Sequence, residues 1–135
     1  MPGKSAAFES GKALEKAVAD LGESLGLGVR SQVKVGRRLW GAVRNIDVVM
    51  TRKDGDRTLG LECKAQKGGG SAEEKIVATI HDIAAWPIPG LVVFAGEGSS
   101  DKFVSYLHST GKAVAFDDLE SWLRLFFGLP DSPRR

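Results

Sequence analysis

The segment from residue 44 to residue 66 limits most strongly the folds open to this chain. It holds two short runs rich in apolar residues, at about 44–51 and 58–66, and Asp54-Gly55 lies between them. An Asp-Gly pair between two such runs is a strong signal for a β-hairpin. We therefore expect two adjacent antiparallel strands that are joined by a tight turn.

The flanking sequence predicts a sheet with helices on both faces. Ser71-Ala72-Glu73-Glu74 matches a capping box, which marks the start of a helix, and Pro87 ends that helix. In chain order we expect a helix at 5–25, strands at about 29–38, 44–51 and 58–66, a helix at about 71–85, a strand at 91–95, a helix near 100–109, a strand near 113–116 and a helix near 118–127. This order, αβββαβ followed by αβα, predicts an α/β fold with a mixed sheet.

Composition sets the class of protein. The 135 residues, 42% of them hydrophobic, fit a single domain over 1–135 that needs no disulfide or metal staple. One cysteine and two histidines exclude a disulfide framework and argue against a structural zinc site. The first residues lack the apolar run of a signal peptide, and no stretch has the ~20 apolar residues of a membrane span. We expect a soluble, cytoplasmic protein.

Charge is unevenly distributed along the chain. Residues 1–70 hold 13 Lys and Arg against 8 Asp and Glu, whereas residues 71–135 hold 6 against 9. Ten of the basic residues lie between 30 and 67. Such a density suits a surface that faces a polyanion, although a solvated basic face would look the same.

Polar residues on the expected hairpin are the candidates for chemistry. Strand alternation places Glu62, Lys64 and Gln66 on one face. If Asp54-Gly55 is a two-residue type I′ turn, Asp47 lies opposite Glu62, with Cβ atoms about 4.5–5.5 Å apart. A turn shifted by one residue would place Asp47 opposite Lys64 instead. Apolar neighbours indicate a largely buried location, where two carboxylates repel unless a cation lies between them, and hard oxygen ligands suit Mg²⁺ or Mn²⁺.

These residues resemble a known family. Asp47, followed by Glu62-x-Lys64 and Gln66, resembles the PD-(D/E)xK nuclease superfamily in its E-x-K-x-Q variant, although Ile46 stands at the proline position of the nominal motif. The sequence is similar to archaeal Holliday junction resolvases and other small restriction-endonuclease-like nucleases. The resemblance implies a restriction-endonuclease-like fold and a metal-dependent endonuclease that hydrolyses DNA phosphodiester bonds, structure-selective at junctions, flaps or nicks.

The resemblance also implies roles for individual residues. Asp47 and Glu62 would bind one or two Mg²⁺ or Mn²⁺ ions, with the backbone carbonyl of Cys63 as a further ligand. Lys64 would orient the attacking water or stabilise charge on the phosphorane. Gln66 would position Lys64 or the scissile strand.

A glutamate on the first helix completes the implied metal site. Of Glu9, Glu15 and Glu23, only Glu15 lies on the flank of the apolar stripe of that helix, so we assign the role to Glu15. The spacing Gly11-x-x-x-Glu15 is similar to the corresponding helix of archaeal Holliday junction resolvases. A solvated glutamate is the equal alternative.

The expected partner is DNA. Basic residues near the motif would contact its phosphates, namely Arg37, Arg38, Arg44, Lys67 and Lys75. For Lys75 a simple exposed lysine on a capped helix is the alternative. The apolar residues at 119–129 are broader than one stripe, so we expect them to close the core, and a homodimer contact is the alternative. A catalytically idle nucleic-acid-binding or assembly module with the same fold is the alternative to the nuclease.

Overall fold

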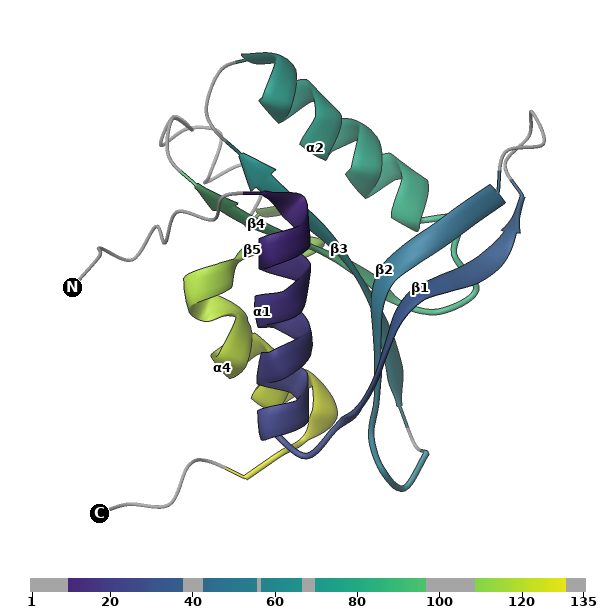
Figure 1. Cartoon of the computed structure of the whole chain (residues 1–135), viewed down its shortest axis with the longest axis vertical. Coiled ribbons are helices and arrows are strands. Elements are labelled where there is room, and N and C mark those ends of the chain that lie inside the picture. The colour runs from purple at the N-terminus through teal and green to yellow at the C-terminus, as the bar shows by residue number, and fades with distance from the viewer. Residues whose placement is uncertain (1–9, 38–42, 56, 67–69, 97–108, 131–135) are drawn as a thin grey trace.

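The computed structural model describes residues 10–37, 43–55, 57–66, 70–96 and 109–130 (Figure 1). The helices are α1 (Gly11–Ser24), α2 (Gly70–Ile83) and α4 (Phe116–Phe127), and the strands are β1 (Gly28–Arg37), β2 (Val43–Thr51), β3 (Thr58–Gln66), β4 (Gly90–Gly96) and β5 (Ala113–Ala115). The predicted elements are confirmed to within a few residues, with two exceptions. The first helix begins at Gly11 and not at residue 5, and most of the helix expected near 100–109 lies outside the described residues.

The strands form one mixed sheet in the order β1-β2-β3-β4-β5. β1, β2 and β3 are antiparallel neighbours, whereas β4 is parallel to β3, and β5 to β4. Parallel neighbours need a long crossover connection, and α2 provides the one between β3 and β4. The predicted α/β class with a mixed sheet is therefore confirmed.

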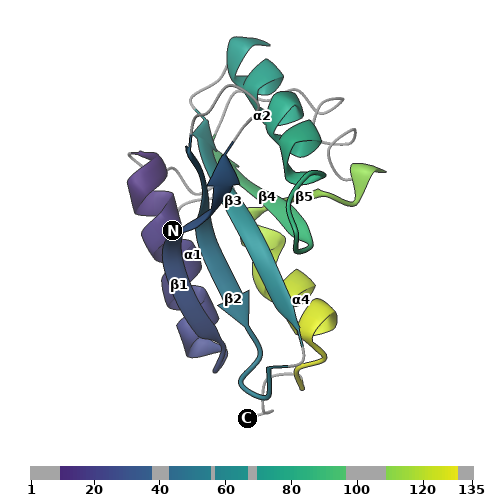
Figure 2. The same ribbon diagram turned by 90° about the vertical axis from the view of Figure 1, so that its right-hand side faces the viewer.

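Helices cover both faces of the sheet (Figures 1 and 2). α1 contacts β1, β2 and β3, and α4 contacts β4 and β5. Together they bury one apolar cluster, which includes Leu14, Leu61 and Leu119. α2 covers the opposite face, where Ile76 and Trp86 pack in a second cluster. The sheet is thus buried on both sides, and any polar side chain on its central strands is in a partly apolar setting.

α1 is held close to the sheet. Its first turn is capped by Ser10, whose side chain accepts a hydrogen bond from the Ala13 amide at 3.2 Å. Further along, Gly22 is buried, and a Cβ atom there would lie 2.8 Å from Cε of Met50. This close approach brings the inner flank of α1 down onto β1 and β2.

The hairpin has the expected register with a different turn. β2 and β3 pair as Val48↔Leu61 and Thr51↔Thr58, which is the register that aligns Asp47 with Glu62. The predicted type I′ turn is wrong, because it requires a positive φ at both central residues and only Gly55 has one (φ 77°). The chain reverses through a longer loop, in which the Gly55 amide donates to the Arg52 carbonyl at 2.7 Å.

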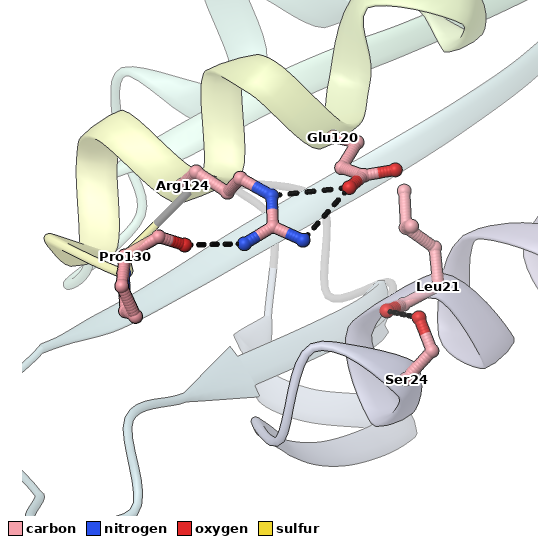
Figure 3. A network of polar contacts seen from close by, with 5 residues as sticks. All are labelled: Leu21, Ser24, Glu120, Arg124 and Pro130. Atoms are coloured by element: carbon pink, nitrogen blue, oxygen red, sulfur yellow. Dashed lines mark hydrogen bonds and ion pairs between the residues drawn. The ribbon is translucent and has the colours of Figure 1, made fainter. Parts of the chain in front are cut away.

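Polar contacts secure the C-terminal ends of α1 and α4 (Figure 3). Arg124 donates to the Glu120 carboxylate through Nε and Nη2, and to the Pro130 carbonyl through Nη1. The Ser24 hydroxyl donates to the Leu21 carbonyl at 2.7 Å. The hairpin tip joins this end of α4, because Arg52 donates to the Phe127 carbonyl at 2.9 Å.

None of the helices in the described part of the chain has the length and apolar character that a membrane span requires.

Candidate active site

β2 and β3 separate at the predicted motif. Their ladder ends at Val48↔Leu61, one step before Asp47 and Glu62 would pair. β2 is also irregular there, because Ile46 belongs to the cluster under α2 while Val48, two residues on, belongs to the cluster on the other face. Regular alternation would place both on one face. The sheet therefore opens where the two acidic residues lie.

Side chains replace the missing ladder bonds. Oδ2 of Asp47 accepts a hydrogen bond from the Cys63 amide at 2.9 Å. In return, the backbone of Asp47 interacts with the Glu62 carboxylate, which lowers the pKa of that group. Both partly buried carboxylates are thus tied to the backbone of the opposite strand.

Gln32 is a site residue that sequence reasoning missed. It lies on β1 opposite Asp47, between the pairs Ser31↔Val48 and Val33↔Ile46. Its Nε2 donates to Oε1 of Glu15 at 3.0 Å and to Oδ1 of Asp47 at 3.2 Å. Among the described residues it is the only non-glycine with a positive φ, at 51°. No sequence signal marks it, because nothing distinguishes this glutamine from any polar residue on an edge strand.

The environment of Glu62 disfavours the negative charge of its carboxylate. Burial raises the pKa of its carboxyl to about 7, and the negative charge of Asp47 adds to this effect. Lys64 opposes the pKa shift, while Asp82 on α2 contributes to it weakly. Within the described residues, the buried Oε1 of Glu62 has no hydrogen-bond partner. A buried acceptor is seldom left unpaired, so this oxygen is placed to receive a cation or a water held by one.

Cys63 contributes its backbone and not its thiol. The side chain is buried in the cluster beneath α1, and burial raises the pKa of the thiol further above its ordinary range. The charges of Asp47, Glu15 and Glu62 act in the same direction. The thiol therefore stays protonated and is no nucleophile. The Cys63 amide faces β2, and the carbonyl of a strand residue points to the same side as its amide, so this carbonyl also faces the opening.

The structure gathers part of the predicted set. The charges of Glu15, Asp47, Glu62 and Lys64 all act on Cys63, and those of Asp47 and Lys64 also act on Glu62. Glu15 is partly buried, whereas Glu23 is exposed at the far end of α1. The other predicted residues lie on backbone whose side chains are not described, or outside the described residues altogether. Gln66, Arg37, Arg44 and Lys75 belong to the first group, and Arg38 and Lys67 to the second.

The residues present fit a divalent cation. Three carboxylates and a main-chain carbonyl form a set of hard oxygen donors, which Mg²⁺ and Mn²⁺ prefer. Among the described residues, the buried Oε1 of Glu62 has no hydrogen-bond partner and could take up such an ion. No three acidic, histidine or cysteine side chains in the described ranges form a ready-made cluster, however. Instead, Glu15 and Asp47 both accept a hydrogen bond from the Gln32 amide.

Comparisons with known proteins show which family and which folds this chain is similar to. Residues 6–122 match the PD-(D/E)XK nuclease superfamily domain. A protein of unknown function, AF1548, has a similar structure with a TM-score of 0.51 and 20% identity, over 76% of this chain and 56% of that one. A repair endonuclease from Pyrococcus abyssi has a TM-score of 0.45 and 14% identity, over 80% of this chain and 47% of that one. The chain thus spans about half the length of both proteins. No curated protein is significantly similar in sequence.

The likeness to AF1548 concerns the fold alone, but the family match extends over most of the chain. The matched range includes all five strands and the cluster around Asp47 and Glu62. A five-stranded mixed sheet flanked by three described helices is also consistent with a restriction-endonuclease-like fold. The chain therefore belongs to the PD-(D/E)XK nuclease superfamily.

Proposed function

We propose that this protein is a divalent-metal-dependent endonuclease that hydrolyses DNA phosphodiester bonds. The superfamily typically uses divalent metals and acts on nucleic acids. The observation that carries the proposal is the buried, unpartnered Oε1 of Glu62, which lies beside Asp47 and Lys64 where β2 and β3 separate. An acid, a second acid and a lysine at one opening of the sheet are the groups that metal-assisted hydrolysis of a phosphodiester requires.

In this proposal the carboxylates of Asp47, Glu62 and Glu15 hold the cation, together with the Cys63 carbonyl. A divalent ion bound there supplies Lewis acidity toward the phosphate and lowers the pKa of water. Lys64, whose charge already acts on Glu62, stabilises negative charge that develops on the phosphorane oxygens or orients the water. Gln66, at the end of β3, positions Lys64 or the scissile strand.

The DNA would approach from the basic side of the chain. Arg30 and Lys34 on β1 are exposed, on the strand that also carries Gln32. We assign phosphate contacts to the basic residues that lie near the motif in the sequence, namely Arg37, Arg38, Arg44, Lys67 and Lys75. Contacts of this kind bind the backbone and not the bases, so they favour recognition of DNA by structure, as at junctions, flaps or nicks.

A cleavage assay tests the proposal. Purified protein with Mg²⁺ or Mn²⁺ is incubated with linear duplex, single-stranded, flap and four-way junction DNA. Glu62→Gln and Lys64→Ala should abolish cleavage, whereas the exposed Glu23→Gln and Lys112→Ala serve as matched controls and should cut at the wild-type rate. DNA binding without cleavage of any substrate would identify an idle binding module and overturn the nuclease.

A further inference from the structure

We propose that Gln32 is a positioning residue that takes the place of a cation between Glu15 and Asp47 in the metal-free protein and is displaced when a divalent ion binds. The inference rests on the proposed function, because it concerns the same metal site. Gln32 does not belong to the D…E-x-K motif, and it competes with the ion for the carboxylates of Glu15 and Asp47.

The first argument is the geometry of the bridge. A single nitrogen, Nε2 of Gln32, donates to one carboxylate from α1 and to another from β2, at 3.0 and 3.2 Å. An ionised carboxylate only accepts hydrogen bonds, so the amide must turn its NH₂ group and not its oxygen toward both. The two protons of that group are thereby both used. A cation held by the carboxylates of Glu15 and Asp47 together would compete with this nitrogen for their oxygens.

The second argument is the backbone of Gln32. Its φ of 51° lies in a region that residues with a Cβ atom disfavour, and the non-glycine residues that tolerate it best are Asn and Asp. The flanking residues Ser31 and Val33 keep their ladder partners on β2. Glycine would adopt this conformation without cost, but it has no side chain to bond the two acids. We therefore attribute the glutamine at this strained position to its amide, which reaches both carboxylates.

The third argument is thermodynamic. The carboxylates of Glu15 and Asp47 repel each other where they share the Gln32 nitrogen as donor. The neutral amide offsets this repulsion less well than a cation does. In the proposed exchange the ion displaces Nε2 of Gln32, and both hydrogen bonds are lost. An interaction present only in the metal-free state stabilises that state and weakens ion binding by the same factor. For two solvent-accessible bonds to carboxylates, this factor is roughly tenfold.

The inference predicts a gain of metal affinity upon loss of a polar residue. Mn²⁺ is titrated calorimetrically into wild-type protein, Gln32→Ala and Gln32→Gly, with thermal melts in chelator beside each titration. Gln32→Ala should bind Mn²⁺ roughly tenfold more tightly and melt at a lower temperature without metal. Gln32→Gly should show the same gain of affinity but melt higher than Gln32→Ala, because glycine relieves the backbone strain.

Ser31→Ala, on the neighbouring exposed position, is the matched control and should keep wild-type affinity. If wild-type protein binds Mn²⁺ and both Gln32 variants bind it equally or more weakly, the displaced bridge is refuted, and weaker binding would make Gln32 itself a ligand. If the wild-type protein binds no Mn²⁺ at all, the metal-dependent function fails, and the bridge has nothing to compete with. Should Gln32→Ala not fold, Gln32→Gly carries the test alone.

Discussion

Replacing Glu62 by Gln should stabilise the metal-free protein, and the gain should depend on pH. Glu62 is partly buried beside the negative Asp47, and its Oε1 has no hydrogen-bond partner in the described part of the chain. The amide of glutamine keeps the shape of the side chain but carries no charge. The substitution therefore removes an electrostatic cost that exists only while no cation is bound.

The magnitude follows from the pKa of Glu62. Burial and Asp47 raise this pKa from 4.5 to about 7, so the folded state keeps a proton that the unfolded state has released between these pH values. The wild-type free energy of unfolding must then fall as pH rises through this window. The full cost, reached above pH 7, is about 2–3 kcal/mol after allowance for partial exposure to solvent. Below pH 4.5 both states are protonated, and the cost vanishes.

Urea denaturation in chelator at pH 5 and pH 8 measures the effect. Glu62→Gln should exceed the wild-type free energy of unfolding by ~2 kcal/mol or more at pH 8, and by much less at pH 5. Glu23→Gln, on the exposed end of α1, is the control and should follow the wild type at both pH values. Saturating Mn²⁺ should raise the stability of the wild type and not of Glu62→Gln. An equal difference at both pH values would refute the argument that the buried charge is the cause.

Four further predictions concern the same site and the surfaces around it. Lys64→Ala should abolish cleavage while Mn²⁺ affinity, measured by calorimetry, stays near that of the wild type; a loss of Mn²⁺ binding would contradict the role given to Lys64. Cys63→Ala should cost about 1 kcal/mol of stability in urea denaturation, because it leaves a small cavity beneath α1, and nicking should continue because only the carbonyl is proposed as a ligand. An inactive but folded Cys63→Ala would show that the thiol takes part. Affinity for DNA in Ca²⁺ should fall steeply between 50 and 200 mM salt, because each phosphate contact releases counterions; binding that ignores salt would exclude the basic segment 30–67 as the DNA surface. Light scattering should detect a dimer that Leu125→Ser weakens, since Leu125 on α4 is 85% exposed; a constant mass of 14.4 kDa at all concentrations would rule the dimer out.

The amino-acid sequence determined the elements and the residues of the motif, because both depend on local pattern. Apolar alternation located β2 and β3, and the short connection at Asp54-Gly55 required them to be antiparallel neighbours. The register that aligns Asp47 with Glu62 followed from the same count, although the reversal is longer than a type I′ turn. Register survived this error because the strands are held by their buried faces as well as by the loop.

Only the tertiary structure decided how the acids are arranged. Helical spacing could place Glu15 on the flank of α1, but its contact with Gln32 depends on how closely Gly22 lets that helix approach the sheet. The irregularity of β2 at Asp47, the positive φ of Gln32 and the unpartnered oxygen of Glu62 likewise arise where three segments far apart in sequence meet. Local pattern reports which face a side chain occupies in a regular strand. It cannot report where a strand ceases to be regular, because that depends on the balance of packing and charge across neighbouring elements.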